Sequence, residues 1–283
     1  MENNNKKVVL IGGSNGIGLA IGKKLLDCGY TLEICDCLPP EEGVLDMEKV
    51  KYHHSDLLDF DEELYTNLAH DKDVEILMIT AGIGRIADFQ FHHIAEIEKI
   101  LTVDTVSTIK ILRVFYERIL AKENFYAGVM GSISGWLSSP SASVYAAAKA
   151  AVVRFIESVN IELEAYGSTN RILDVSPASF KGSRFYGGKN DLTETAVLAD
   201  DIVKHLFARD VRFRIMRKRS RVFLKGIIMI RTNMVYIVIN TKKNPGDWII
   251  RKELKLAIFL EHLTCFMWDT STCSKERNSN VTI

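Results

Sequence analysis

Tyr145 and Lys149, separated by three alanines, could form a proton-transferring pair. In a helix this spacing puts both side chains on one face. A phenol has an ordinary pKa of about 10, and a cation within about 4–6 Å stabilises its anion and lowers that pKa. Ser132, thirteen residues before Tyr145, adds a hydroxyl that could hydrogen-bond a reacting oxygen. The three residues therefore predict an acid/base site.

Each of these residues also has a purely structural interpretation. Ser132 could form a turn at a strand end, Tyr145 could pack against the core at a helix start, and Lys149 could be a solvated charge. The choice between the two interpretations depends on what else the chain contains.

A glycine-rich turn lies between the first apolar run and the first helical pattern. Glycines let the backbone approach a pyrophosphate closely, and the following helix presents its N–H groups and its positive dipole end. By itself such a pattern can be a tight turn, but a strand before it and a helix after it favour nucleotide binding. The predicted contacts are Gly12, Ser14, Asn15, Gly16, Ile17 and Gly18.

Asp36 ends the second apolar run, eighteen residues beyond Gly18. A carboxylate at this place can bind the adenosine ribose diol and repels a 2′-phosphate, so it favours NAD, with NADP the less favoured cofactor. Asn15 agrees, because the turn holds no cation for that phosphate. The alternative is a solvated loop acid, since Glu41 and Glu42 make the next loop acidic as well.

With these motifs in order, the sequence resembles the short-chain dehydrogenase/reductase (SDR) family from residue 7 to about 212. The turn matches the family's Thr-Gly-x-x-x-Gly-Ile-Gly, with Ile11 in place of Thr. Further segments that match family motifs are His54-Ser55-Asp56-Leu57, Thr80-Ala81-Gly82, Gly131-Ser132-Ile133-Ser134-Gly135 with Tyr145 and Lys149, and Ser176-Pro177-Ala178. Ser134 competes for the serine role, but only Ser132 keeps the family's distances to Tyr145 and Gly135.

The resemblance implies hydride transfer between a nicotinamide and a carbonyl or secondary alcohol substrate. Tyr145 would exchange the proton, Lys149 would lower the phenol pKa and hold the nicotinamide ribose, and Ser132 would bind the substrate oxygen. Asp104 stands where the family has a proton-relay Asn, and a carboxylate cannot donate as an amide does. Further cofactor contacts implied by the resemblance are Asp56, Leu57, Ala81, Gly82, Tyr145, Lys149 and Pro177.

Alternating apolar runs and helical patterns predict the α/β class: a single Rossmann-like, doubly wound parallel sheet with helices on both faces. The predicted strands lie near 7–12, 30–35, 50–53, 74–79, 126–132 and 171–176. The predicted helix from about Val144 to Tyr166 is apolar on more than one side, which requires a second packing partner. Because the family pairs this helix with its counterpart in another subunit, we expect a homodimer or homotetramer.

The formal charge of zero conceals a division of the chain. Residues 1–212, the predicted Rossmann-fold domain, hold 22 basic and 31 acidic residues, whereas residues 213–283 hold 14 and 5. This basic C-terminal extension is atypical of the family. Three interpretations remain open: an appendage for acidic partners, a helical cap including Leu254–Trp268, and, as we prefer, translation in a shifted frame from about residue 213.

The N-terminal residues, the length of the apolar runs and the cysteines limit the location and function that we expect for this protein. Met1–Lys7 does not read as a secretory signal, and no apolar run is long enough to cross a bilayer. Five cysteines form no metal-ligand spacing and no even disulfide set, which suits a reducing cytosol. We expect a cytoplasmic enzyme without metal, membrane or nucleic-acid partners. The rival is a weakly active or inactive nucleotide-binding sensor; in either case residues 179–194 would select the ligand.

Overall fold

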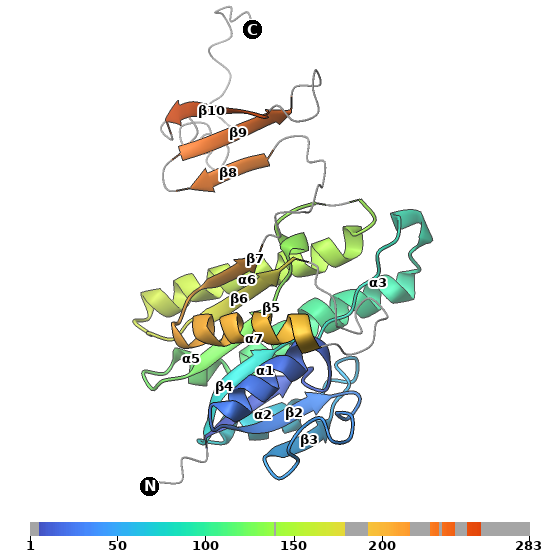
Figure 1. Cartoon of the computed structure of the whole chain (residues 1–283), viewed down its shortest axis with the longest axis vertical. Coiled ribbons are helices and arrows are strands. Elements are labelled where there is room, and N and C mark those ends of the chain that lie inside the picture. Colours follow the sequence, from blue (N-terminus) through green and yellow to red (C-terminus); the bar gives the residue numbers. More distant parts are fainter. Residues whose placement is uncertain are drawn as a thin grey trace, which may run out of the picture. The chain divides into compact units, whose positions relative to one another are not determined.

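The computed structural model describes residues 6–138, 140–178, 192–215, 227–231, 234–240 and 248–255. They divide between two compact units, Met1–Lys218 and Arg219–Ile283. The first unit is an α/β domain and carries all the predicted site residues (Figure 1).

The centre of the first unit is a seven-stranded parallel sheet in the order β3-β2-β1-β4-β5-β6-β7. Its strands are β1 (Lys7–Ile11), β2 (Thr31–Asp36), β3 (Val50–His54), β4 (Val74–Ile79), β5 (Tyr126–Met130), β6 (Ile172–Pro177) and β7 (Arg212–Ile215). The central strands are buried on both faces, which explains their nearly continuous apolar sequences. The doubly wound parallel sheet predicted from the alternation is confirmed.

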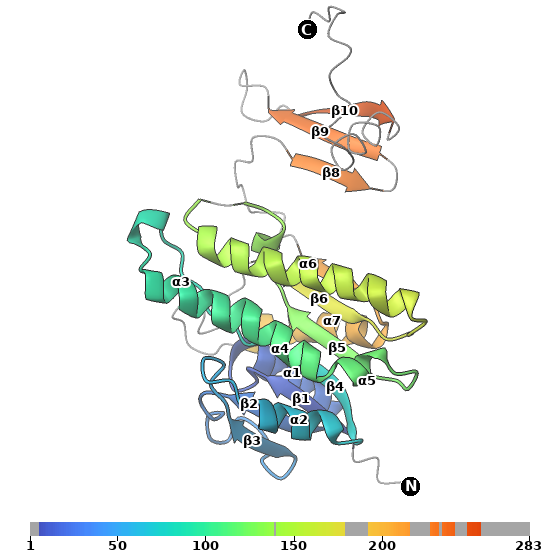
Figure 2. The ribbon, with the colours of Figure 1, turned by 180° about the vertical axis from the view of Figure 1, so that it is seen from behind.

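Helices cover both faces of this sheet. One face carries α1 (Gly16–Asp27) and α7 (Leu192–Phe207), as Figure 1 shows. The other face, seen in Figure 2, carries α2 (Glu62–His70), α3 (Ile94–Leu101), α4 (Ser107–Val114), α5 (Tyr116–Leu120) and α6 (Ser143–Ala165). Short turns η1 (Phe89–Phe91), η2 (Thr102–Val106) and η3 (Ile133–Gly135) complete the unit.

The core has two layers, one on each face of the sheet. Val9, Leu77 and Val129 point toward the α2–α6 side, whereas Val8, Ile76 and Leu173 point toward α1 and α7. This division follows from the period of two along a strand. The six predicted strands are all present, but β7 was not predicted because its charged residues hide the apolar Phe213, which packs in the second layer.

Two irregularities place side chains in the site. The sheet order reverses between β1 and β4, which opens a crevice at their carboxyl ends. Between α3 and α4 the chain widens into the π-helical turn η2, and the Asp104 side chain lies in this turn. Turns of this kind commonly occur at functional sites.

The described residues of the second unit form an antiparallel sheet in the order β10-β9-β8. The strands are β8 (Ile227–Arg231), β9 (Met234–Asn240) and β10 (Trp248–Lys255). Leu254 and Lys255, the start of the suggested helical cap, therefore lie in a strand, and residues 256–268 of that segment fall outside the described residues. None of the helices in the described ranges has the length and hydropathy needed to cross a bilayer.

Candidate active site

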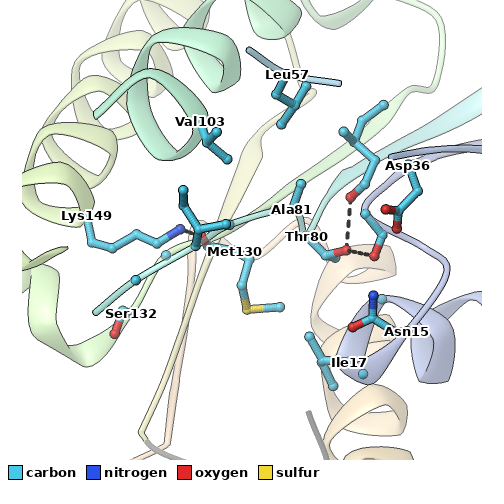
Figure 3. A pocket seen from close by; sticks show the side chains of 18 of the residues that line it. Asn15, Ile17, Asp36, Leu57, Thr80, Ala81, Val103, Met130, Ser132 and Lys149 are labelled. Carbon is cyan, nitrogen blue, oxygen red and sulfur yellow. Dashed lines mark hydrogen bonds between the residues drawn. The ribbon is translucent and has the colours of Figure 1, made fainter. Parts of the chain in front are cut away.

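A cavity of about 500 Å³ lies at the carboxyl ends of the parallel strands (Figure 3). Its walls come from the segments that follow β1, β2, β4, β5 and β6, together with α6. Nearly all the residues predicted as cofactor contacts line it, and only Ser14 among them does not. The volume is that of a small-molecule site.

The glycine-rich turn forms one wall, and it has no room for a side chain at Gly12 or Gly18. Gly12 has a φ of +83°, and a Cβ there would lie 2.5 Å from the Ala81 nitrogen. A Cβ on Gly18 would overlap the Gly12 carbonyl and the Thr80 hydroxyl. This turn therefore offers bare backbone to a ligand, as a bound pyrophosphate requires.

Helix α1 starts at this wall. Its N-cap residue, Asn15, makes no side-chain capping bond, and the first turn of the helix holds no acidic residue. Gly16, Ile17 and Gly18 line the cavity, so the positive end of the helix dipole adjoins the bare turn. The residues present therefore fit the diphosphate of a dinucleotide.

Asp36 links β2 to the same turn. Its Oδ2 accepts the Ser14 N–H at 3.0 Å, and its Oδ1 accepts the Leu38 N–H at 3.4 Å. Ser14 thus acts through its backbone, and its own hydroxyl is buried without a hydrogen-bond partner among the described residues. Asp36 also lines the cavity, so this carboxylate is both a support of the turn and a part of the ligand wall.

Asp56 and Leu57 line the cavity together with Asp36. The Asp56 Oδ1 accepts the Leu58 N–H at 2.9 Å, which folds the chain after β3 into a turn. In Figure 3 Leu57 points toward the space between Val103 and Asp36. The apolar side chains of Leu57 and Val103 offer a surface suited to an adenine ring.

Ser132 and Lys149 lie on the opposite side of the cavity from Asp36 (Figure 3), and Tyr145 lines the same cavity. Lys149 is 3% exposed, and its ammonium donates to the Met130 carbonyl at 3.0 Å. The same ammonium lies 5.8 Å from the Tyr145 ring centroid. The Ser132 hydroxyl accepts the Ser134 N–H at 3.1 Å. The three residue types predicted from spacing are therefore neighbours in space.

Asp104 lies behind Lys149 and does not line the cavity. Its Oδ1 accepts the Ile83 N–H at 2.7 Å, and its Oδ2 is 3.7 Å from the Lys149 ammonium. Burial raises the pKa of the Asp104 carboxyl, and the charge of Lys149 and the Ile83 N–H offset this only partly. Burial alone would lower the pKa of Lys149, but Asp104 and Tyr145 raise it overall, which favours the ammonium form.

Several supporting residues were not predicted as site residues. Thr80 donates its hydroxyl to the Ile11 and Gly12 carbonyls at 2.9 and 3.0 Å, which fixes the turn against β4. Met130 lines the cavity, where Figure 3 shows its side chain, and its carbonyl accepts a hydrogen bond from the Lys149 ammonium. Lys99 lines the cavity from α3. Pro177 and Ala178 line it after β6, whereas the predicted ligand-selecting segment lies outside the described residues from 179 to 191.

Comparison with known proteins places this site in context. The family model for short chain dehydrogenases matches residues 6–186. "Dehydrogenase RED2" of Cochliobolus heterostrophus is 29% identical over 161 residues, which are 55% of this chain and 60% of that protein. Mouse "17-beta-hydroxysteroid dehydrogenase type 1" is 27% identical over 49% of this chain and 40% of its own length. The matched regions thus span less than two thirds of these relatives.

Solved structures share the fold. A short-chain dehydrogenase from Sphingobium yanoikuyae, in complex with NADPH, has a TM-score of 0.63 at 22% identity, covering 77% of this chain and 89% of that one. A bulky-bulky ketone specific alcohol dehydrogenase from Comamonas testosteroni has a TM-score of 0.64 at 19% identity, with coverages of 77% and 88%. With the family model matching more than half of its residues, the chain belongs to the short-chain dehydrogenase/reductase family.

Proposed function

We propose that this chain is an oxidoreductase that uses NAD(H) to interconvert a carbonyl compound and the corresponding secondary alcohol. The observation that carries the proposal is the shared cavity: Ser132, Tyr145 and Lys149 line its one side, and the bare Gly12–Gly18 turn lines another. A site for a dinucleotide and a set of proton-handling side chains thus face the same enclosed space. When bound, the nicotinamide would supply or accept the hydride.

Tyr145 is the proposed acid/base. Its phenol would donate a proton to the substrate oxygen during reduction and remove it during oxidation, across a hydrogen bond of about 2.6–3.2 Å. The Lys149 ammonium favours the phenolate, because it lies 5.8 Å from the phenol ring in a buried setting. This electrostatic support would let a phenol exchange protons near neutral pH.

Ser132 and Asp104 have supporting roles in the proposal. The Ser132 hydroxyl would donate to the substrate oxygen as negative charge develops there. Asp104 would hold the Gly82–Ile83 segment and the Lys149 ammonium, since it contacts both. A Cβ on Gly82 would lie 3.1 Å from both the Asp104 Oδ1 and the Lys149 ammonium, so the three groups are closely packed.

NAD is the proposed cofactor rather than NADP. Asp36 lines the cavity at the end of β2, where a ribose 2′-substituent would lie, and its carboxylate would repel a phosphate there. The cations that line the described cavity, Lys99 and Lys149, belong to α3 and α6 rather than to the turn or β2. A structural relative was solved in complex with NADPH, so the fold admits that cofactor and the proposed preference for NAD rests on Asp36 alone.

The proposed substrate class is broad. The relatives named for a hydroxysteroid and for bulky ketones favour an apolar ketone or secondary alcohol over a charged substrate. Ile83 and Ile133 line the cavity near the serine and are compatible with an apolar substrate.

The test is a direct one. The full chain is titrated with NADH by fluorescence and then assayed for NADH oxidation across ketones, keto-sugars and quinones. We expect turnover that falls about 100- to 10,000-fold in Tyr145→Phe, with NADH affinity retained. Turnover that survives Tyr145→Phe would remove the proposed acid/base.

The alternative is a nucleotide-binding sensor on the same fold. The specific observation that favours it is Asp104, a buried carboxylate at the position where the family has an amide. NADH binding without turnover of any substrate, in both the wild type and Asp104→Asn, would support the sensor. Recovery of turnover in Asp104→Asn alone would instead identify Asp104 as the cause of low activity.

A further inference from the structure

Two neighbouring strands carry four polar side chains on one face at the carboxyl end of the sheet. In the parallel register Asp174 of β6 lies opposite Arg212 of β7, and Ser176 lies opposite Arg214. Residues two apart share a face of a sheet. Ile172, two residues before Asp174, packs with α6, so this polar group faces α6 as well.

Asp174 and Ser176 begin a directed chain of hydrogen bonds. The Ser176 hydroxyl donates to the Asp174 Oδ1 at 2.7 Å and accepts the Trp136 Nε1–H at 3.3 Å. The direction is fixed, because an indole N–H can only donate and a carboxylate can only accept. Asp174 is 2% exposed, and its Oδ2 has no hydrogen-bond partner among the described residues. Burial raises the pKa of the Asp174 carboxyl, and the Ser176 hydrogen bond and the charges of Arg214 and Arg212 offset this in part.

Trp136 connects this chain of hydrogen bonds to β7, because two arginines of that strand lie over its ring. The Arg214 guanidinium carbon lies 3.3 Å from the Trp136 ring centroid, and that of Arg212 lies at 4.9 Å. Arg154 of α6 is farther away, at 5.9 Å. Glu157 forms ion pairs with Arg154 and Arg212. Of the three arginines, Arg214 lies closest to the Trp136 ring. Contacts of this kind hold an indole ring in place.

The same residues surround the segment that carries Ser132. At its start, a Cβ on Gly131 would overlap Asp174 Oδ1 and lie 2.6 Å from the Ser176 hydroxyl. At its end, the Trp136 side chain is bonded to that same hydroxyl. Ser132 therefore lies between Gly131, which packs closely against Ser176, and Trp136, which is hydrogen-bonded to it. On the other side, Gly135 lies against the Lys149 carbonyl, where a Cβ would be 2.8 Å from the oxygen.

We propose that Asp174, Ser176 and Arg214 are positioning residues for Ser132, and that the last strand of the sheet thereby helps to set the geometry of the proposed active site. The inference rests on the proposed function for its effect on turnover. Its structural part, the fixing of the 131–136 segment, stands independently of any substrate.

The experiment uses the full chain with Ser176→Ala, Trp136→Phe, Arg214→Met and the matched control Arg154→Met. Hydrogen–deuterium exchange is followed in peptides covering residues 131–137, without cofactor. We expect exchange there to rise about tenfold in Ser176→Ala and Arg214→Met, whereas Arg154→Met leaves it unchanged. Unaltered exchange in Ser176→Ala and Arg214→Met would overturn the proposal, as would an equal rise in the control.

Kinetics test the catalytic consequence. The kcat of Ser176→Ala should fall about 10- to 100-fold, as expected for a misplaced catalytic group, with NADH affinity unchanged. In a Ser132→Ala background the Ser176 substitution should have no further effect on kcat, because the group that it positions is gone. Additive losses in the double variant would refute the positioning role.

Two further outcomes are informative. If the wild type turns nothing over, the proposed function fails, and the exchange measurement alone decides whether the network fixes the segment. If Ser176→Ala does not fold, the exposed Arg214 provides the deciding variant, because its substitution leaves the buried hydroxyl and carboxylate in place.

Discussion

Asp36 binds the backbone of the glycine-rich turn through the Ser14 N–H and also faces the cavity. Asp36→Asn keeps an acceptor for that N–H and removes the negative charge. Since a like-charged pair costs several kcal/mol, we expect NADPH affinity to rise about tenfold or more relative to NADH. Fluorescence titration with both cofactors measures the ratio. Asp59→Asn, at an exposed residue outside the cavity lining, is the control, and an unchanged ratio in Asp36→Asn would contradict the assignment.

Cys37 offers a test of cofactor binding that needs no substrate. It lines the cavity, and burial, together with the nearby Asp36 carboxylate, raises the pKa of its thiol. A raised pKa means less thiolate at a given pH, so alkylation should accelerate steadily from pH 7 to 9 without reaching a plateau. Saturating NADH should slow the alkylation of Cys37 and leave that of the exposed Cys28 unchanged.

Peptide mapping by mass spectrometry separates these cysteines. Burial raises the pKa of Cys35 to about 12, so this thiol should remain unlabelled in the folded protein. Labelling of Cys37 at equal rates with and without NADH would place the cofactor elsewhere.

Sequence reasoning worked best for residues whose chemistry is local. Gly12, Gly18 and Asp36 were recognisable because a turn between a strand and a helix constrains each of them. The side-chain network at Ser176 was not recognisable, since Asp174, Trp136 and Arg214 come from three separate segments. Their relation depends on strand register and on the packing of η3, which a single sequence does not display.

Among the elements, the strands were predictable and the irregular turns were not. Six strands stood out as apolar runs, but β7 alternates Arg212, Phe213 and Arg214, and its arginines serve Trp136 rather than solvent alone. The π-helical turn that holds Asp104 has no pattern of its own, because it widens a continuous helical segment. The periodicity of apolar residues thus predicted the first six strands of the sheet, but neither β7 nor the π-helical turn.

Asn170 shows how one side chain can secure an element boundary. Its amide donates to carbonyls of Ile119, Ala121 and Glu123, and its Oδ1 accepts the Phe125 N–H at 3.1 Å. Asn170→Ala would leave several of these buried groups unpaired, so we expect a loss of about 3 kcal/mol in the free energy of unfolding. Urea denaturation measures it.

The matched control is Asn124→Ala in the connection between α5 and β5 that Asn170 contacts; this variant loses one exposed bond to Arg209 and should cost less than about 0.5 kcal/mol. NADH affinity should not change in either variant. Equal losses of stability would show that the boundary depends on something other than the Asn170 amide.

Helix α6 bears on assembly. Val152, Ile156 and Leu163 are buried against its own sheet, whereas Ala147, Ala151 and Ile161 are exposed, Ile161 by 70%. We propose that this second apolar side packs against the same helix of another copy. Ala151→Glu should then shift the protein toward monomer in light scattering, while Glu164→Gln, an exposed polar change on the same helix, should not. A monomeric wild type would refute the assembly.

For the molecule as a whole, the described part of the cavity belongs to the first unit alone. A chain ending at Lys218 retains all seven strands of the parallel sheet. We expect it to bind NADH within about threefold of the full chain. Loss of folding or of binding in that truncation would show that residues 219–283 contribute to the first unit.

The opposite net charges of residues 1–212 and 213–283 motivate the shifted-frame hypothesis. The shifted-frame hypothesis stays a prediction, and sequencing the source DNA around the Phe213 codon tests it: a single intact frame in independent reads would refute it. Phe213 is buried in the second core layer and packs against His205 with the rings tilted and their centroids 4.6 Å apart. We therefore expect any shift to lie beyond β7.

The glycine-rich turn is held by three strands. Its Gly12 N–H donates to the Cys35 carbonyl in β2, and the Thr80 hydroxyl after β4 donates to the Ile11 and Gly12 carbonyls. During synthesis on the ribosome the first two strands emerge well before Thr80 does. A nascent chain of that length lacks the Thr80 bonds to its turn, so we expect nucleotide binding only after the fourth strand has left the exit tunnel.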